Sequence, residues 1–197
     1  MIASLRGTLA AKSPTEVVVD VHGVGYALSI PLSTYERLGP LSSEVFLYTH
    51  QHVREDTLQL FGFATEEERA MFRLLLSVTG IGPKMAQGIL SGIPVPELRT
   101  HLAGGNLPAL TAIPGIGRKL AERLVLELRE KIGKTPAAAG SPADEHTHIH
   151  TEALMALVSL GYARPAAERA LRTAQQELGS TPTLETLLKH ALRHAGR

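Results

Sequence analysis

Two glycine-rich segments with the same spacing are the residues of this chain best suited to hold a ligand. Segments 78–86 (VTGIGPKMA) and 113–121 (IPGIGRKLA) share Gly-Ile-Gly, a Lys two positions after the second Gly, and an Ala two positions after the Lys. Glycine accepts a positive φ and lets the backbone approach a ligand closely. The amides of the Gly-Ile-Gly turn, with the free amides at the start of the following helix, are expected to point outward and attract an anion, and the Lys adds a point charge. The pattern therefore predicts two sites for a phosphate of a nucleic-acid backbone, held without base reading.

Repetition makes this prediction specific, because a single Gly-x-Gly often only ends a helix. An apolar-x-Gly-Ile-Gly-x-Lys-x-Ala segment between two helices is the helix-hairpin-helix signature, with the Ile expected to turn inward and pack the helices. Pro83 stands where the second copy has Arg118, so the two sites are expected to be unequal. The predicted DNA-binding residues are Gly80, Ile81, Gly82, Pro83 and Lys84 in the first copy, and Gly115, Ile116, Gly117, Arg118, Lys119 and Arg123 in the second.

Other chemistry finds little support in the sequence. Neither copy has the Gly-x-x-x-x-Gly-Lys-Ser/Thr pattern of a phosphate-binding nucleotide loop, and neither follows a predicted strand. No motif places a catalytic triad, a carboxylate dyad or a cofactor. The absence of cysteine excludes disulfides and thiolate metal sites, and it fits a cytoplasmic protein. His146, His148 and His150 alternate without a carboxylate or thiolate frame, which is more often incidental than a metal site.

Residues 64–134 must position the two segments, and they read as short helices separated by Gly and Pro. Thr65 and Glu68 form a capping-box pattern at the first helix. This part also holds the basic excess, with ten Lys/Arg and seven Asp/Glu for a net charge of +3. The other helices are expected at 83–90, 95–103, 107–111 and 118–132.

Residues 1–63 read as β structure. Short runs of β-branched and apolar residues are separated by turn residues, and five such strands in this length suggest an OB-like barrel. Arg54-Glu55-Asp56 is expected at an exposed hairpin tip, where two carboxylates by themselves would serve solubility. The strands are expected at 4–9, 15–21, 25–30, 45–52 and 57–63, with a helical turn at 33–38.

The remainder reads as a tethered helical unit. Residues 135–150 are rich in Pro and Ala and predict a flexible linker. Residues 151–197 predict a three-helix mini-domain of the UBA-like kind, with helices at 152–160, 165–178 and 183–194. Such a unit is typically a docking module, and a plain C-terminal appendage is the alternative. The predicted fold class is therefore α+β, with several domains.

The order of these parts resembles the RuvA family of bacterial Holliday-junction-binding subunits. The resemblance rests on the barrel, Arg54-Glu55-Asp56, Leu60-Phe61-Gly62-Phe63, the paired Gly-Ile-Gly hairpins, the Pro/Ala linker and a tail with Leu160-Gly161-Tyr162. It covers the whole chain and is densest over 45–131.

The resemblance implies a function that composition alone does not show. Members form a homotetramer, alone or as an octamer on DNA, whose barrels build the centre and whose hairpins hold the arms of a four-way junction. An acidic pin at the crossover corresponds to Glu55 and Asp56. The tail docks on the RuvB AAA+ motor for branch migration in recombination, DNA repair and the SOS response, with the RuvC resolvase in the same complex.

Two further functions share part of this pattern. A nuclease or glycosylase would use the hairpins for targeting, but it needs a catalytic Asp or Lys cluster and 115–131 contains no Asp. A general duplex-binding scaffold that recruits a partner through its tail fits all the residue-level observations equally well. Only the resemblance favours a non-catalytic junction-binding subunit over that scaffold.

Overall fold

The computed structural model describes residues 1–133, 142–179 and 182–195. The chain divides into two compact units, Met1–Thr135 and Pro136–Arg197. Within the described ranges, every helix is too short or too polar to cross a lipid bilayer.

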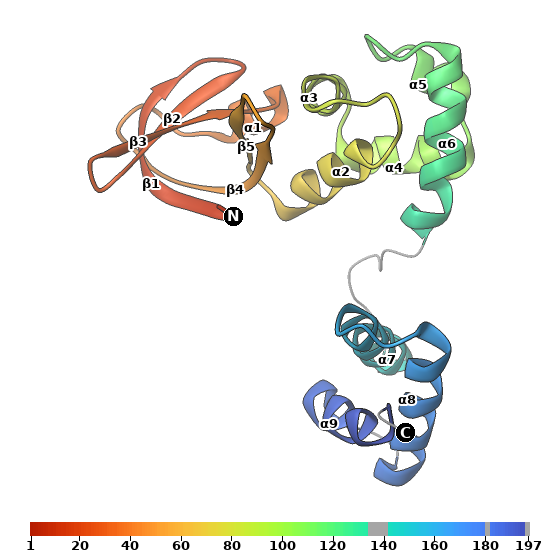
Figure 1. The fold of residues 1–197 in the computed structure, drawn as a ribbon. Coiled ribbons are helices and arrows are strands. Elements are labelled where there is room, and N and C mark those ends of the chain that lie inside the picture. Colours follow the sequence, from red (N-terminus) through yellow and green to blue (C-terminus); the bar gives the residue numbers. More distant parts are fainter. Residues whose placement is uncertain (134–141, 180–181, 196–197) are drawn as a thin grey trace. The chain divides into compact units, whose positions relative to one another are not determined.

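The first unit begins with a closed five-stranded barrel (Figure 1). The strands pair in the order β1-β2-β3-β5-β4, with β4 returning to β1. All pairs are antiparallel except β3 and β5. Alternating side chains such as Leu9, Val19 and Leu47 are fully buried inside it. This arrangement confirms the predicted OB-like barrel. Its strands are β1 (Ser4–Lys12), β2 (Glu16–Val21), β3 (Val24–Ser29), β4 (Glu44–Val53) and β5 (Leu58–Phe63).

Helices follow the barrel in the first unit (Figure 1), and their apolar core includes residues of β5. Phe61 and Phe63 of β5 pack with Phe72 of α2, at ring-centroid distances of 5.1 and 4.9 Å. The apolar core then continues through the following helices. The helices are α1 (Leu32–Arg37), α2 (Glu66–Leu76), α3 (Pro83–Gly92), α4 (Val95–Gly104), α5 (Leu107–Thr111) and α6 (Arg118–Gly133).

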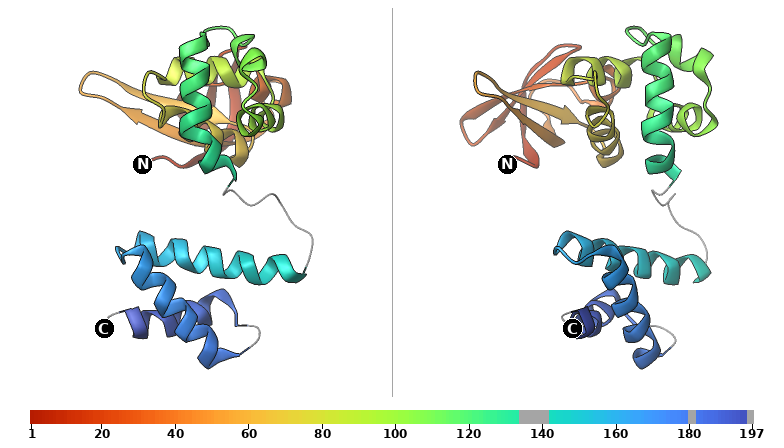
Figure 2. Two further views of the ribbon diagram at one scale, coloured as in Figure 1. Left: turned by 90° about the vertical axis from the view of Figure 1, so that its right-hand side faces the viewer. Right: turned by 45° about the vertical axis from the view of Figure 1, so that its right-hand side comes forward.

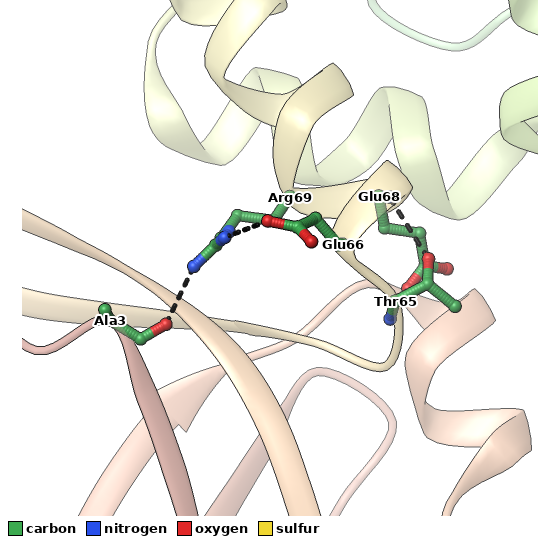
Figure 3. A network of polar contacts seen from close by, with 5 residues as sticks. All are labelled: Ala3, Thr65, Glu66, Glu68 and Arg69. Carbon is green, nitrogen blue, oxygen red and sulfur yellow. Dashed lines mark hydrogen bonds and ion pairs between the residues drawn. The ribbon is translucent and has the colours of Figure 1, made fainter. Parts of the chain in front are cut away.

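A buried carboxylate joins the barrel to α2. Thr65 caps α2 by accepting from the Glu68 amide at 3.2 Å, and Glu68 accepts in return from the Thr65 amide at 3.3 Å, which confirms the capping box (Figure 3). Glu68 also accepts from the Thr34 hydroxyl on α1 at 3.0 Å and is only 4% exposed. Arg69 extends the joint, since its guanidinium donates to the Ala3 carbonyl at 2.8 Å (Figure 3). These bonds fix the direction in which α2 leaves the barrel.

Helix α3 is anchored to the barrel as well. Gln87 donates to the carbonyl of Ile30 at 2.6 Å. The Ser91 hydroxyl accepts from the Leu32 amide at 3.0 Å. The first helical hairpin therefore touches the barrel with both of its helices.

The described part of the second unit consists of three helices (Figure 2). They pack around an alanine- and leucine-rich core that includes Leu157, Leu171 and Leu187. Its first helix begins earlier than predicted, so residues 142–150 are helical and do not belong to a linker. Pro142 occupies the first helical position, where its missing N–H is tolerated, and the composition of the segment concealed this start. The rest of the predicted linker, 134–141, lies outside the described residues. The helices are α7 (Pro142–Ser159), α8 (Arg164–Leu178) and α9 (Leu184–Ala195).

Candidate nucleic-acid interface

Both glycine-rich segments fold into the same turn. The Ile81 amide donates to the Val78 carbonyl at 3.1 Å, and Gly80 has φ of +95°. The Ile116 amide donates to the Ile113 carbonyl at 3.1 Å, in a turn whose Gly115 has φ of +87°. A positive φ at the third residue is the requirement of a type II turn, which explains the first glycine of each copy.

The apolar positions of the two copies are buried in matching pairs. Ile81 and Ile116 are 6% and 4% exposed, which confirms that the isoleucines turn inward. Buried residues also match at this spacing in the helices on either side of the turns. A complete helix-hairpin-helix unit is therefore repeated at a 35-residue interval. The buried pairs are Leu75 with Leu110, Val78 with Ile113, Ala86 with Ala121, and Ile89 with Leu124.

The second glycine of each copy has a different role from the first. Gly82 has φ of −92° and ψ of 172°, an extended conformation open to any residue. Its carbonyl accepts from the Ala86 amide at 2.9 Å, as that of Gly117 does from Ala121 at 2.9 Å, so both glycines are helix N-caps. A Cβ at either position would meet no atom of the described chain within 4 Å. The fold therefore does not require these glycines, and the open space in front of them suits the close approach of a ligand.

The amides available to such a ligand are fewer than the motif suggests. The isoleucine amides close their own turns, so the expectation that the whole Gly-Ile-Gly backbone faces outward is wrong. In the first copy the amides of Gly82, Lys84 and Met85 have no partner among the described residues, and Pro83 has no N–H. In the second copy the same holds for the amides of Gly117, Arg118 and Lys119. The two copies thus offer the same number of these amides to an anion.

Cations lie beside these amides in both copies. Lys84 and Lys119 are exposed, and neither has a hydrogen bond or an ion pair with the described residues. Arg118 is 83% exposed at its side chain and pairs with Glu122 one turn along α6, at 3.1 Å. An exposed pair of this kind is weak, so Arg118 can exchange its partner for a phosphate at little cost.

Arg123 lies elsewhere than its place in the sequence suggests. The sequence predicts that it adds to the second site, but its guanidinium donates to the Thr79 carbonyl in the first turn, at 2.8 Å. Lys131, further along α6, donates to the Ser77 hydroxyl at 3.1 Å. Helix α6 of the second copy therefore supports the turn of the first. Sequence reasoning missed Lys131, and no local signal could have revealed either contact, because each spans more than forty residues.

Glu55 and Asp56 form the two-residue turn between β4 and β5. The Arg54 amide donates to the Thr57 carbonyl at 2.8 Å, and the Thr57 amide donates back at 3.4 Å. Both carboxylates are exposed at the tip of this hairpin, which projects from the barrel at the far left of the left-hand view (Figure 2). Asp56 accepts from the Thr57 hydroxyl at 3.0 Å. The predicted exposed tip is thus where the sequence placed it.

His50, close to the joint between the barrel and α2, has a pKa below the ordinary histidine value. His50 on β4 packs edge-on against Phe72, with ring centroids 5.3 Å apart. Burial, together with the positive charge of Arg73 and the neighbouring His52, lowers the pKa of His50. In the part of the chain that the structure describes, no group of three or more His, Cys, Asp or Glu side chains is placed to hold a metal ion. The side chains of His146 and His148 lie outside the described residues.

Comparison with known proteins agrees with this architecture. Residues 1–62 match the family model described as RuvA N terminal domain, residues 72–130 a SAM-like helix-hairpin-helix tandem, and residues 149–196 the RuvA C-terminal domain. The chain is 50% identical to the Holliday junction branch migration complex subunit RuvA of Syntrophotalea carbinolica, over 98% of each chain. The chain belongs to the RuvA family.

Other relatives carry the same name and cover the chain equally well. The identity is 46% with the protein of Geobacter sp. (strain M21) and 45% with that of Solibacter usitatus, each over 98% of both chains. The family expected from the residues, and the fold class expected with it, are therefore confirmed. The individual site residues and their roles remain predictions.

Proposed function

We propose that this chain is a DNA-binding subunit, without catalysis of its own, that holds four-way (Holliday) junctions by their duplex backbones and supports branch migration. The names of its relatives and the helix-hairpin-helix tandem support this function. One observation carries it. The same turn occurs twice, each time with a lysine that has no partner among the described residues and a glycine whose missing side chain the fold itself does not require. Such a site suits a phosphate, and two of them suit a duplex held without base reading.

The grip is the set of residues proposed to hold the duplex backbone, and the role of each residue follows from its position. The amides and charges that contact phosphate come from Gly82 and Lys84 in the first copy, and from Gly117, Arg118 and Lys119 in the second. Gly80, Ile81, Gly115 and Ile116 shape the two turns, and Pro83 starts α3. Arg123 acts as a positioning residue for the first turn, through the Thr79 carbonyl.

Glu55 and Asp56 are proposed as an acidic pin at the crossover. Carboxylates beside the exchanging strands repel their phosphates. The repulsion opposes tight static binding and favours sliding of the DNA. The rigid two-residue turn supports this role because it holds both charges at the outermost point of the hairpin.

The partners follow from the family and from the second unit. We expect a homotetramer, with an octamer on DNA as the larger assembly, an AAA+ motor of the RuvB kind that supplies the ATPase, and a RuvC resolvase in the same complex. Residues 151–197 are the expected motor-docking unit. Its exposed apolar residues include Met155, Val158 and Leu160, at 55%, 44% and 63%, whereas Leu171 is fully buried and belongs to the core. A role on chromosomal DNA implies the bacterial cytoplasm.

A competition gel-shift tests this function. A labelled four-way junction is challenged with unlabelled junction or with linear duplex of the same total length. The proposal expects the junction to compete much more strongly than the duplex. Equal competition would instead favour the general duplex-binding scaffold.

The pin is tested separately. Glu55→Gln/Asp56→Asn removes two charges while keeping the shape of the tip. It should tighten junction binding and change the rate of branch migration in the presence of the motor. An unchanged affinity together with an unchanged rate would remove the pin from the proposal and leave the grip intact.

A further inference from the structure

An apolar pair lies directly beneath the acidic tip. Val53 ends β4 and Leu58 begins β5, and the two residues form the last pair of these strands before the turn. Val53 is 61% exposed and Leu58 is 65% exposed. Neither belongs to the packed cores of the described residues. The fold therefore holds this pair in water without using it for packing.

The charges around the pair restrict what can cover it. Arg54 and Thr57 come next along the hairpin, and Glu55 and Asp56 lie beyond them at its end, both exposed. A phosphate brought onto the pair would meet these carboxylates. An uncharged surface meets no such repulsion.

The base pairs of DNA offer such a surface where their stacking is interrupted. Duplex DNA hides its base planes, but the arms of an open four-way junction end at the crossover. Proteins often insert apolar side chains at unstacked base steps. Arg54 lies on the same tip, and its Nε donates to His52 Nε2 at 3.0 Å, so its charge is held close to the hairpin.

We propose that Val53 and Leu58 form an apolar wedge that packs against unstacked base pairs at the crossover of a four-way junction. The proposal rests on the function proposed above. It assigns opening of the junction centre to two parts of one hairpin: the carboxylates keep phosphates away, and the apolar pair covers the bases that this separation exposes.

The test uses the full chain and four-way junctions carrying 2-aminopurine, whose fluorescence rises when it unstacks. One junction has the probe at the crossover, and the other has it in the middle of an arm. Wild-type protein should raise the signal at the crossover and leave the arm probe unchanged. Val53→Thr/Leu58→Thr keeps side chains suited to strands, so it should fold normally, lose about half or more of the crossover signal, and change junction affinity by less than about threefold.

Two further variants complete the test. Val24→Thr changes another exposed apolar residue, at the β2–β3 hairpin and 54% exposed, and it should leave the signal as in wild type. Leu58→Phe enlarges the wedge and should keep or raise the signal. An unchanged signal in the Thr double variant would overturn the proposal. So would a loss of oligomer mass in that variant by light scattering, which would identify a second copy as the occupant. If wild-type protein failed to prefer the junction, the proposed function itself would fail, and the wedge with it.

Discussion

The two copies of the hairpin have the same turn but different surroundings. The first copy is attached to the barrel through Glu68, Gln87 and Ser91, and Arg123 holds its turn from the side. Among the described residues, the bonds that tie α6 to distant parts of the chain run from Arg123 and Lys131 to the first copy. The first copy thus has more support, and the second has one more cation, since Arg118 stands where the first copy has Pro83.

This difference suggests a division of labour within one grip. A supported site fixes the DNA relative to the barrel and therefore relative to the acidic tip. A more highly charged site adds affinity. Substitutions at matching positions of the two copies should therefore have unequal effects where the surrounding contacts or charges differ. Where the surroundings are alike, the effects should be equal.

The largest effect is expected at the second glycines, where the copies are alike. Gly82→Ser and Gly117→Ser place a side chain where a phosphate would lie, yet Ser is a good N-cap and the space is open. Each should weaken junction binding by roughly tenfold or more, as expected when a charged hydrogen bond is removed, with Tm unchanged or slightly higher. Binding titrations and thermal melts on the same samples measure both. A variant with a lowered Tm and unchanged junction binding would show that the second glycine serves the fold and not the ligand.

The first glycines should show the opposite pattern. Gly80→Ala and Gly115→Ala put a side chain on a residue with φ of +95° or +87°. Each should lower the free energy of unfolding by about 1–2 kcal/mol. Urea denaturation measures this loss. Equal losses in the two copies would support the shared turn, while no loss in either would mean that the turns relax without strain.

A smaller and unequal effect is expected for the two arginines of α6. Arg123→Ala removes the bond to the Thr79 carbonyl and should cost about 1 kcal/mol of stability. Arg118→Ala removes only an exposed ion pair and should cost about 0.5 kcal/mol or less. In junction binding Arg118→Ala should have the larger effect, because Arg118 is proposed to contact phosphate directly. The same order in stability and in binding would make Arg123 a phosphate ligand and not a positioning residue.

The smallest effect concerns pH at the joint between β4 and α2. The pKa of His50 is lowered by burial and by Arg73, so the folded chain takes up this proton less readily than the unfolded chain. Its contribution to stability is therefore complete above the ordinary value of 6.5 and declines as the pH falls below it. The decline in Tm between pH 8 and pH 5.5 should be smaller in His50→Gln than in wild type. Identical declines in Tm would show that the surroundings of His50 in the folded chain do not lower its pKa.

Local patterns in the sequence predicted most of the elements, since their causes are local. Runs of β-branched and apolar residues between turn residues predicted the strands, and the Thr65–Glu68 pair predicted the start of α2. The outward direction of the Ile81 and Ile116 amides was wrong because the turn itself uses them. The contact of Arg123 with Thr79 could not be predicted, because it depends on how α6 packs across the first copy. Leu160 and Leu171 look alike in sequence, and only the packed helices show that one is exposed and the other buried.

The central claim, that both hairpins hold DNA through phosphates, is tested most directly by salt dependence. Junction binding by wild type and by Lys84→Ala/Lys119→Ala is measured over a range of salt concentrations. The slope of log K against log salt should become shallower in the double variant, by about 0.9 for each phosphate that the protein no longer neutralises, with the weaker affinity seen at low salt. The same slope and the same affinity as wild type would contradict the claim.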